Sequence, residues 1–363
     1  MRCQSTDKER ATTECEAIVI VKHAKEVARR WVIEEASSTP GFSGAFYHGS
    51  TNWLLDDAPL PATSDVDVMV VLADPNPPDK PGKFIYRDVM LEVSYLPSDR
   101  LWSPELVLGQ YHLAGSFRTP SIILDPSGQL TELQAAVSKD YAKRQWVYRR
   151  CQHARDKILG GFSLHEPDPV PDRVVAWLFP AGITTHVLLV AGLKNPTVRR
   201  RYEAARELLA DYGHLDFYHT LLEMLGCVQM SRARVEHHLA ALADAFDSAK
   251  AVIETPFFFA SDISDIARPI AIDGSRELIA GGDHRGAIFW MVATYSRCQK
   301  VFHHDAPMQM QERFGHGYRE LLADLGIVSF ADLQRRHEQV KRSLPQVWEV
   351  AEAIMAANRG IED

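Results

Sequence analysis

The chain has 363 residues, of which 46% are hydrophobic and 24% are charged, so a disordered chain is excluded and the length predicts two domains rather than one small module. It carries 40 basic and 48 acidic residues, a formal net charge of −8, and therefore lacks the basic surplus that binding to a nucleic-acid backbone normally requires. The five cysteines are scattered without a CxxC pair, which disfavours a zinc or disulfide framework and favours the cytoplasm.

The first part of the chain predicts a helix followed by short strands. Apolar residues recur at steps of three and four over residues 16–35, the period of an amphipathic helix. The acidic residues that precede this segment do not resemble the basic start of a secretion signal. Short runs rich in valine and other apolar residues then predict strands. These expected strands are 45–48, 66–72, 84–86, 89–96 and 121–124.

From residue 131 onward the periodicity is helical almost throughout. The expected helices are 131–160, 171–193, 197–212, 215–226, 231–254, 283–303, 310–325 and 330–358. The prediction is therefore an α+β protein with a small mixed-sheet domain over residues 1–130, which includes the N-terminal helix, and a larger all-helical domain over residues 131–363.

One apolar stretch, Val174 to Leu193, is nearly long enough to span a membrane. It contains Pro180 and Gly182 and several polar residues, and no second such segment accompanies it. These features favour a buried helix of a soluble protein over a membrane span.

The residues that suggest chemistry begin with Asp65 and Asp67, at the start of the expected strand 66–72. Alternate side chains of a strand share a face, so both carboxylates point the same way, about 7 Å apart along the chain. Such a pair repels itself unless a cation balances it. Mg²⁺ prefers oxygen ligands and is usually held by one or two carboxylates together with substrate phosphates.

A third carboxylate would complete a site of this kind. Glu92 is the best candidate, because it lies on the polar face of the strand 89–96, and Asp88 in the preceding turn is the second choice. Two Mg²⁺ ions held by three such acids can neutralise a triphosphate and orient the attacking and leaving oxygens of a displacement at phosphorus.

Gly49 and Ser50 follow the expected strand 45–48. A glycine at such a turn lets backbone N–H groups approach a phosphate closely, and the serine hydroxyl adds a further donor. The pair alone has little specificity. The ordered set of a strand, Gly-Ser, a spacer, an Asp-x-Asp strand and a later acidic strand has much more.

These segments together resemble a known family. His48-Gly49-Ser50 followed by Asp65-Val66-Asp67-Val68 is similar to the signature of the DNA polymerase β-type nucleotidyltransferase superfamily, and Leu91-Glu92-Val93 resembles the third-carboxylate strand of its antibiotic-modifying members, the aminoglycoside nucleotidyltransferases. The resemblance covers residues 42–100. It implies a mixed-sheet catalytic domain, a helical domain that closes the acceptor site, and transfer of a nucleoside monophosphate from an NTP to a hydroxyl group with release of pyrophosphate.

The resemblance also implies roles for individual residues. Gly49 and Ser50 would hold the β- and γ-phosphates of the NTP, expected to be ATP. Asp65, Asp67 and Glu92 would bind two Mg²⁺ ions. The general base stays open between Glu92 and a helical-domain acid such as Asp156 or Glu166. The spacer from Thr51 to Ser64 has fourteen residues, slightly more than is usual in the family.

The acceptor is expected to be a small polar molecule that is cationic or polyhydroxylated, such as an aminoglycoside. Residues 1–140 hold 13 basic and 20 acidic side chains, which suits a cationic acceptor, whereas the remaining residues hold 27 and 28. Two alternatives remain open: an RNA or protein acceptor, and a non-catalytic relic that only binds nucleotide.

Three further segments have simpler interpretations. The run Arg199-Arg200-Arg201 is expected to be a solvated charged surface, and the adjacent His237 and His238 point about 100° apart on a helix and are not expected to share a metal ion. The segment Ala260-Ser261-Asp262, after three phenylalanines, is expected to begin a helix.

Overall fold

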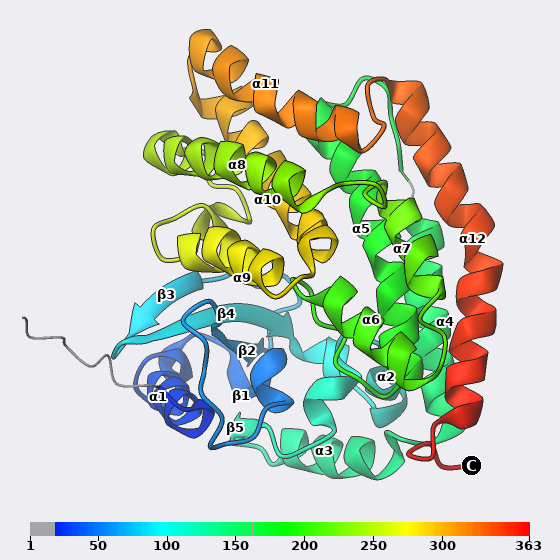
Figure 1. Cartoon of the computed structure of the whole chain (residues 1–363). Coiled ribbons are helices and arrows are strands. Elements are labelled where there is room, and N and C mark those ends of the chain that lie inside the picture. Colours follow the sequence, from blue (N-terminus) through cyan, green and yellow to red (C-terminus); the bar gives the residue numbers. More distant parts are fainter. Residues whose placement is uncertain (1–18, 162) are drawn as a thin grey trace, which may run out of the picture.

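The computed structural model describes residues 19–161 and 163–363. A mixed β-sheet forms from the first part of the chain, and helices make up nearly all of the rest (Figure 1). This arrangement confirms the α+β class. Residues 16–18 of the first predicted helix lie outside the described residues.

The sheet consists of β1 (Phe42–His48), β2 (Val66–Leu72), β3 (Gly82–Tyr86), β4 (Val89–Pro97) and β5 (Ile122–Leu124). All five predicted strands are therefore present, in the spatial order β3-β4-β2-β1-β5. β2 pairs antiparallel with β1 and parallel with β4. Arg87 and Asp88 join β3 to β4 with φ angles of 47° and 64°, as in a two-residue hairpin turn.

Three helices pack against the sheet: α1 (Val21–Glu34), α2 (Pro104–Leu108) and α3 (Gln129–Asp140). Val66 and Val68 of β2 are buried in the core on the side of α1. Val71, which faces the other way, is buried in a second core with residues of α2 and α3. Alternation places Asp67 on the same face as Val71, so that face is apolar at one end and acidic at the other.

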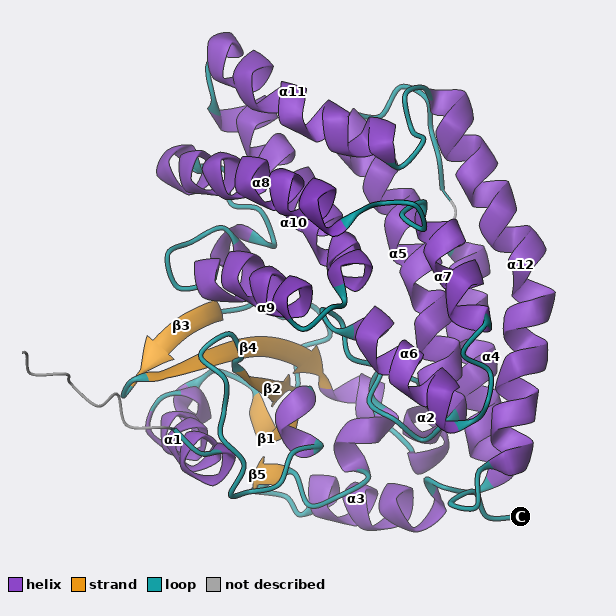
Figure 2. Cartoon of the chain, viewed as in Figure 1, coloured by secondary structure: helices purple, strands orange, loops and turns teal. Residues whose placement is uncertain are grey.

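The rest of the chain forms α4 (Arg144–Gly160), α5 (Val170–Ala191), α6 (Arg201–Asp211), α7 (Phe217–Leu225), α8 (Arg232–Val252), α9 (Gly274–Ala280), α10 (His284–Asp305), α11 (Met308–Asp324) and α12 (Phe330–Ala357) (Figure 2). One apolar core runs through these helices. In Figure 1, α8, α9 and α10 lie on the side of β3 and β4, whereas α12 runs along the opposite side of the molecule.

The apolar helix α5 lies at the centre of the helical region, packed against α4, α6, α10 and α12. Among the residues that the structure describes, it is the one helix long and apolar enough to cross a membrane, and 78% of its most apolar window is buried. Its burial is that of the core helix of a soluble protein.

The prediction of one helix over residues 131–160 is wrong, because α3 ends at Asp140 and α4 begins at Arg144. Neither proline nor glycine marks the break. The C-terminal segment makes it instead: the backbone N–H of Arg144 donates to the carbonyl of Glu362 over 2.7 Å, and the N–H of Glu362 donates to the carbonyl of Ala142 over 3.0 Å.

Candidate active site

Three carboxylates meet where β2 and β4 lie side by side. Asp67 of β2 and Glu92 of β4 are direct partners in the parallel register, and Asp65 immediately precedes β2. One carboxylate oxygen from each of the three residues lies within 4.8 Å of those of the other two. The structure thus brings together the three acids that the sequence selected, and their roles stay a prediction.

The Gly49-Ser50 turn lies against this cluster, because His48 at the end of β1 is the register partner of Asp67. Gly49 has φ 65° and ψ −151°, a conformation that favours glycine. A Cβ atom added to it would lie 1.8 Å from Oδ2 of Asp67. Ser50 then begins a short 3₁₀ helix that ends at Asn52, whose side-chain amide donates to the carbonyl of Tyr47 over 2.6 Å.

The longer spacer after Ser50 is bound to the start of α1. Its residues 56–60 hydrogen-bond through their backbone to the start of α1: the N–H of Val21 donates to Ala58 and that of Lys22 to Asp56. Trp53 packs beneath the guanidinium of Arg118, whose Cζ lies 4.2 Å from the ring centroid. Trp53 therefore anchors the turn to neighbouring chain.

Two lysines partly balance the acids. Nζ of Lys83 lies 2.7 Å from Oδ2 of Asp65 and also contacts Glu92, and Nζ of Lys80 lies 2.8 Å from Oε1 of Glu92. Burial alone would raise the pKa of Glu92, but the two ammonium groups outweigh it and hold that pKa at about 2. Asp67 has no such partner among the described residues.

Asp67 is the acid of the cluster whose negative charge is least compensated. Burial raises the pKa of its carboxyl well above the ordinary value, and repulsion from Asp65 and Glu92 raises it further. The net charge of three ionised carboxylates and two ammonium groups is −1. The three acids lie close together, and nearby cations do not fully balance their charge. They therefore provide the oxygen ligands that Mg²⁺ prefers.

The helical region reaches the same cluster through a residue that the sequence did not indicate. Oδ1 of Asp262 lies 3.6 Å from Nζ of Lys83, and its Oδ2 lies 3.0 Å from the guanidinium of Arg297 on α10. The segment Ala260–Asp262 was expected to begin a helix. It instead forms a short 3₁₀ helix that ends at Asp262. Only the pairing of distant segments could have shown its role, since no local signal marks it.

Two further polar contacts join the helical region to the loop before β2. The guanidinium of Arg199 donates to the carbonyl of Thr63 over 3.1 Å, and the hydroxyl of Thr63 donates to Glu277 of α9 over 2.8 Å. These contacts lie two residues before Asp65 and hold the start of β2 against the helices.

The other candidate acids lie outside the cluster. Asp88 is exposed in the β3–β4 turn, immediately before β4, and the group of acids within 4.8 Å of one another does not include it. Asp156 is exposed on α4 and pairs with Arg155 at 3.9 Å, and Glu166 is exposed in the loop before α5. The structure therefore gives neither helical-domain acid a contact with the three carboxylates.

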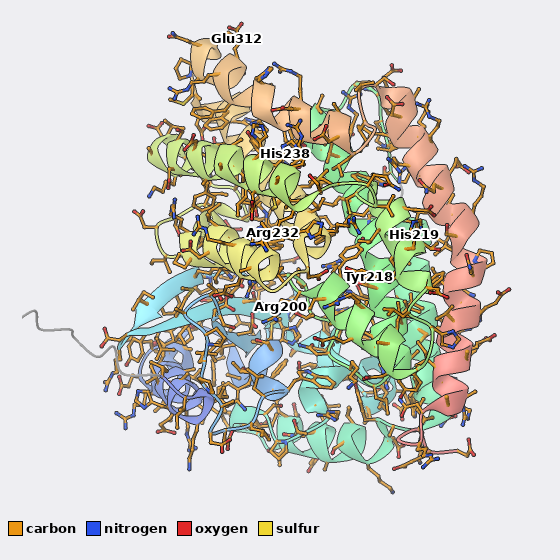
Figure 3. The ribbon with its side chains drawn as sticks, in the orientation of Figure 1. Arg200, Tyr218, His219, Arg232, His238 and Glu312 are labelled. Carbon is orange, nitrogen blue, oxygen red and sulfur yellow. The ribbon has the colours of Figure 1, made fainter. Side chains whose placement is uncertain are left out.

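The expectation of a solvated arginine run is wrong for two of its three members. Arg201 is 2% exposed, and its guanidinium lies over the ring of Phe289 at 3.8 Å from the centroid. Arg199 is partly buried in the contact with Thr63. Arg200, which Figure 3 labels, is exposed, as expected.

His237 and His238, with Glu320 of α11, form a second group whose possible ligand atoms lie within 4.8 Å of one another. These ligand atoms lie close together although adjacent helix residues point about 100° apart, and that the two histidines share no metal ion stays a prediction. His238 lies on α8 (Figure 3), and its Nε2 is 2.7 Å from Asp324. The guanidinium of Arg234 bonds both Glu320 and Asp324, so the group is already balanced by a cation and ties α8 to α11.

No protein-family model matches this chain, and no curated protein matches it. The candidate site is therefore supported by its own geometry and by the motif resemblance.

Proposed function

We propose that the protein is a Mg²⁺-dependent nucleotidyltransferase that transfers a nucleoside monophosphate, AMP from ATP, to a hydroxyl group of a small molecule. The observation that carries this proposal is the meeting of Asp65, Asp67 and Glu92 beside the Gly49-Ser50 turn. The burial of α5 and the scattered cysteines support a cytoplasmic enzyme.

Each group of residues in the site has a separate role. Asp65, Asp67 and Glu92 would hold Mg²⁺, which supplies positive charge to the phosphate oxygens during the displacement. The backbone of Gly49 and the hydroxyl of Ser50 bind the β- and γ-phosphates and so fix the leaving group. Lys80 and Lys83 add positive charge at the same end of β4.

The reaction is a displacement at the α-phosphorus. The acceptor hydroxyl oxygen forms a bond to that phosphorus, while the bond from phosphorus to the oxygen bridging the α- and β-phosphates breaks and its electron pair leaves with pyrophosphate. The hydroxyl proton passes to a carboxylate oxygen of the cluster. The acids thus position the reactants and receive the proton.

In the direct test, the protein is incubated with each NTP, Mg²⁺ and a panel of hydroxyl compounds. Mass spectrometry then detects an added nucleoside monophosphate, and a second assay measures released pyrophosphate. Asp65→Asn and Asp67→Asn should each lower the rate at least about 100-fold, because each removes a charged ligand of the Mg²⁺ that would stabilise the transition state. Wild-type rates in either variant would refute the proposal.

One observation favours a second candidate, a nucleotide-binding relic without activity. Lys83 contacts Asp65 and Glu92 directly, so two of the three acids already have a cation beside them. Calorimetry separates the two functions. Nucleotide binding that is equally strong with Mg²⁺ and with EDTA favours the relic, and binding that requires Mg²⁺ favours the enzyme.

A further inference from the structure

A cavity of about 610 Å³ continues the carboxylate face of the sheet. Its floor includes Met69 of β2 and Leu96 of β4, and its far wall comes from α2 and α4. Met69 lies two residues after Asp67 and shares its face, so the cavity begins about 7 Å along the strand from that carboxylate. This volume suits a small molecule.

The charge of this cavity is opposite to that of the neighbouring cluster. Glu105 is the one acid in its lining, and the carboxylate of Glu105 accepts hydrogen bonds from its own backbone and from Ser103. The basic side chains of the lining are Arg100, Arg149, Lys157, His48, His112 and His153.

Within the described part of the chain, the three permanent cations of the lining have no counter-ion. None of Arg100, Arg149 and Lys157 pairs with a carboxylate among residues 19–161 and 163–363. The guanidinium of Arg149 lies 4.8 Å from the ring centroid of Trp146, a contact that leaves its charge uncompensated. All three side chains are exposed, so they are free to form charge-assisted hydrogen bonds to a bound anion.

The three histidines of the lining have lowered pKa values, mainly because of burial, which favours their neutral forms. The N–H of Tyr111 donates to Nδ1 of His153 over 3.3 Å, so a neutral His153 carries its proton on Nε2. The rings of His112 and His153 lie 5.6 Å apart. Burial, with smaller contributions from His153, His48, Lys157 and Arg100, lowers the pKa of His112 to about 4.

We infer that this cavity binds the acceptor, and that the acceptor carries a phosphate group in addition to its reacting hydroxyl. The inference rests on the proposed function. Gly49, Ser50, the three carboxylates and both lysines lie outside the cavity lining, so a triphosphate held at the Gly49-Ser50 turn leaves the cavity free for a second molecule. A phosphate monoester matches three unpaired cations, whereas a cationic aminoglycoside would be repelled.

The test measures binding of ribose 5-phosphate to the full chain by calorimetry, with Mg²⁺ and α,β-methylene-ATP present to fill the nucleotide site without turnover. Ribose and kanamycin serve as uncharged and cationic comparisons. The variant is Arg149→Ala with Lys157→Ala, and its matched control is Lys139→Ala with Arg359→Ala, which removes two exposed cations outside the cavity. Lys157→Gln alone is a milder variant at an exposed position, should the double variant fail to fold.

The expected result is binding of ribose 5-phosphate but of neither comparison compound, weakened at least about tenfold in the cavity variant and unchanged in the control. No binding up to about 10 mM, where a Kd near 1 mM is still measurable, would overturn the inference. Equal binding by the cavity variant would also overturn it. So would an equal loss of ATP affinity, because the cavity would then hold the nucleotide phosphates.

Failure of the proposed function would look different. In that case ATP binding in Asp65→Asn would equal that of the wild type and would not require Mg²⁺, whatever the result with ribose 5-phosphate. The two measurements therefore separate an incorrect acceptor from an incorrect reaction.

Discussion

The ammonium nitrogen of Lys83 lies 2.7 Å from Oδ2 of Asp65, with the lysine side chain only 6% exposed. The same group contacts Glu92 and lies 3.6 Å from Asp262. One buried cation thus joins the acid just before β2 to acids of β4 and of the helical region. Because Mg²⁺ would bind two of these acids, the lysine and the metal ion have overlapping functions in the electrostatics of the site.

Replacing that lysine should make folding depend on the metal. In Lys83→Met the acids lose their buried counter-ion, and we expect the free energy of unfolding without Mg²⁺ to fall by about 3 kcal/mol. Saturating Mg²⁺ should restore part of this loss. Urea unfolding with Mg²⁺ or with EDTA measures both values, and the exposed Lys139→Met is the control. An equal loss under both conditions would contradict a metal site here.

Replacing the most crowded acid should separate stability from activity. Asp67→Asn keeps the shape of the side chain but removes one of three repelling charges, so we expect nucleotidyl transfer to fall at least about 100-fold while the metal-free protein becomes more stable by about 1 kcal/mol. Thermal unfolding and pyrophosphate release measure the two effects. Asp57→Asn, in the exposed part of the spacer, should change neither. A large loss of stability in Asp67→Asn would indicate a structural role instead.

The fit of Gly49 against Asp67 predicts a strong effect of a single methyl group. Gly49→Ala places its Cβ on the carboxylate and strains a backbone with φ 65°, so we expect about 1–3 kcal/mol of destabilisation and at least about a 100-fold loss of turnover. Gly128→Ala is a close control, because Gly128 has φ 80° but open space around its Cβ position. Gly128→Ala should cost stability while turnover stays normal. Similar activity in the two variants would argue against the role of Gly49.

Stability should decrease in mild acid because of a histidine far from the site. Burial, and to a smaller extent the charge of Lys341, lowers the pKa of His337 on α12 from 6.5 to about 4. The unfolded chain therefore binds this proton first, and stability declines as the pH falls from about 6.5 to about 4. The slope is at most about 1.4 kcal/mol per pH unit for one proton, and less where solvent reaches the ring.

His337→Gln removes this titration and should reduce the slope of unfolding free energy against pH in that interval. His219→Gln, at an exposed histidine of α7, is the control and should leave the slope unchanged. Urea unfolding at several pH values between 4 and 7 provides the measurement. A slope identical to wild type in His337→Gln would show that this histidine does not contribute.

The sequence predicted the strands and the shared faces of the acids because these features depend on local patterns. Alternation over residues 89–96 placed Glu92 on the polar face of its strand, and the Asp-x-Asp spacing fixed the shared face of Asp65 and Asp67. Parallel pairing of β2 with β4 then made Asp67 and Glu92 neighbours. The pairing itself was suggested by the motif resemblance, since no local pattern specifies it.

What the sequence did not predict depends on contacts between distant segments. Asp262 reaches Lys83 across almost 180 residues of chain, and Arg201 is buried against Phe289 although a run of arginines is usually solvated. The break between α3 and α4 depends on Glu362 in the same way. The charge of the cavity also depends on residues that come together only when β1, α2 and α4 pack. The composition of residues 1–140 does not show this, and its acidity therefore suggested a cationic acceptor.

The central position of α5 has a consequence for biosynthesis. Its apolar surface is completed by α10 and finally by α12, which leaves the ribosome more than a hundred residues later. The nascent chain must therefore carry an incompletely covered apolar helix while more than a hundred further residues are made, and cellular yield should depend on chaperones that shield such segments until the last long helix arrives.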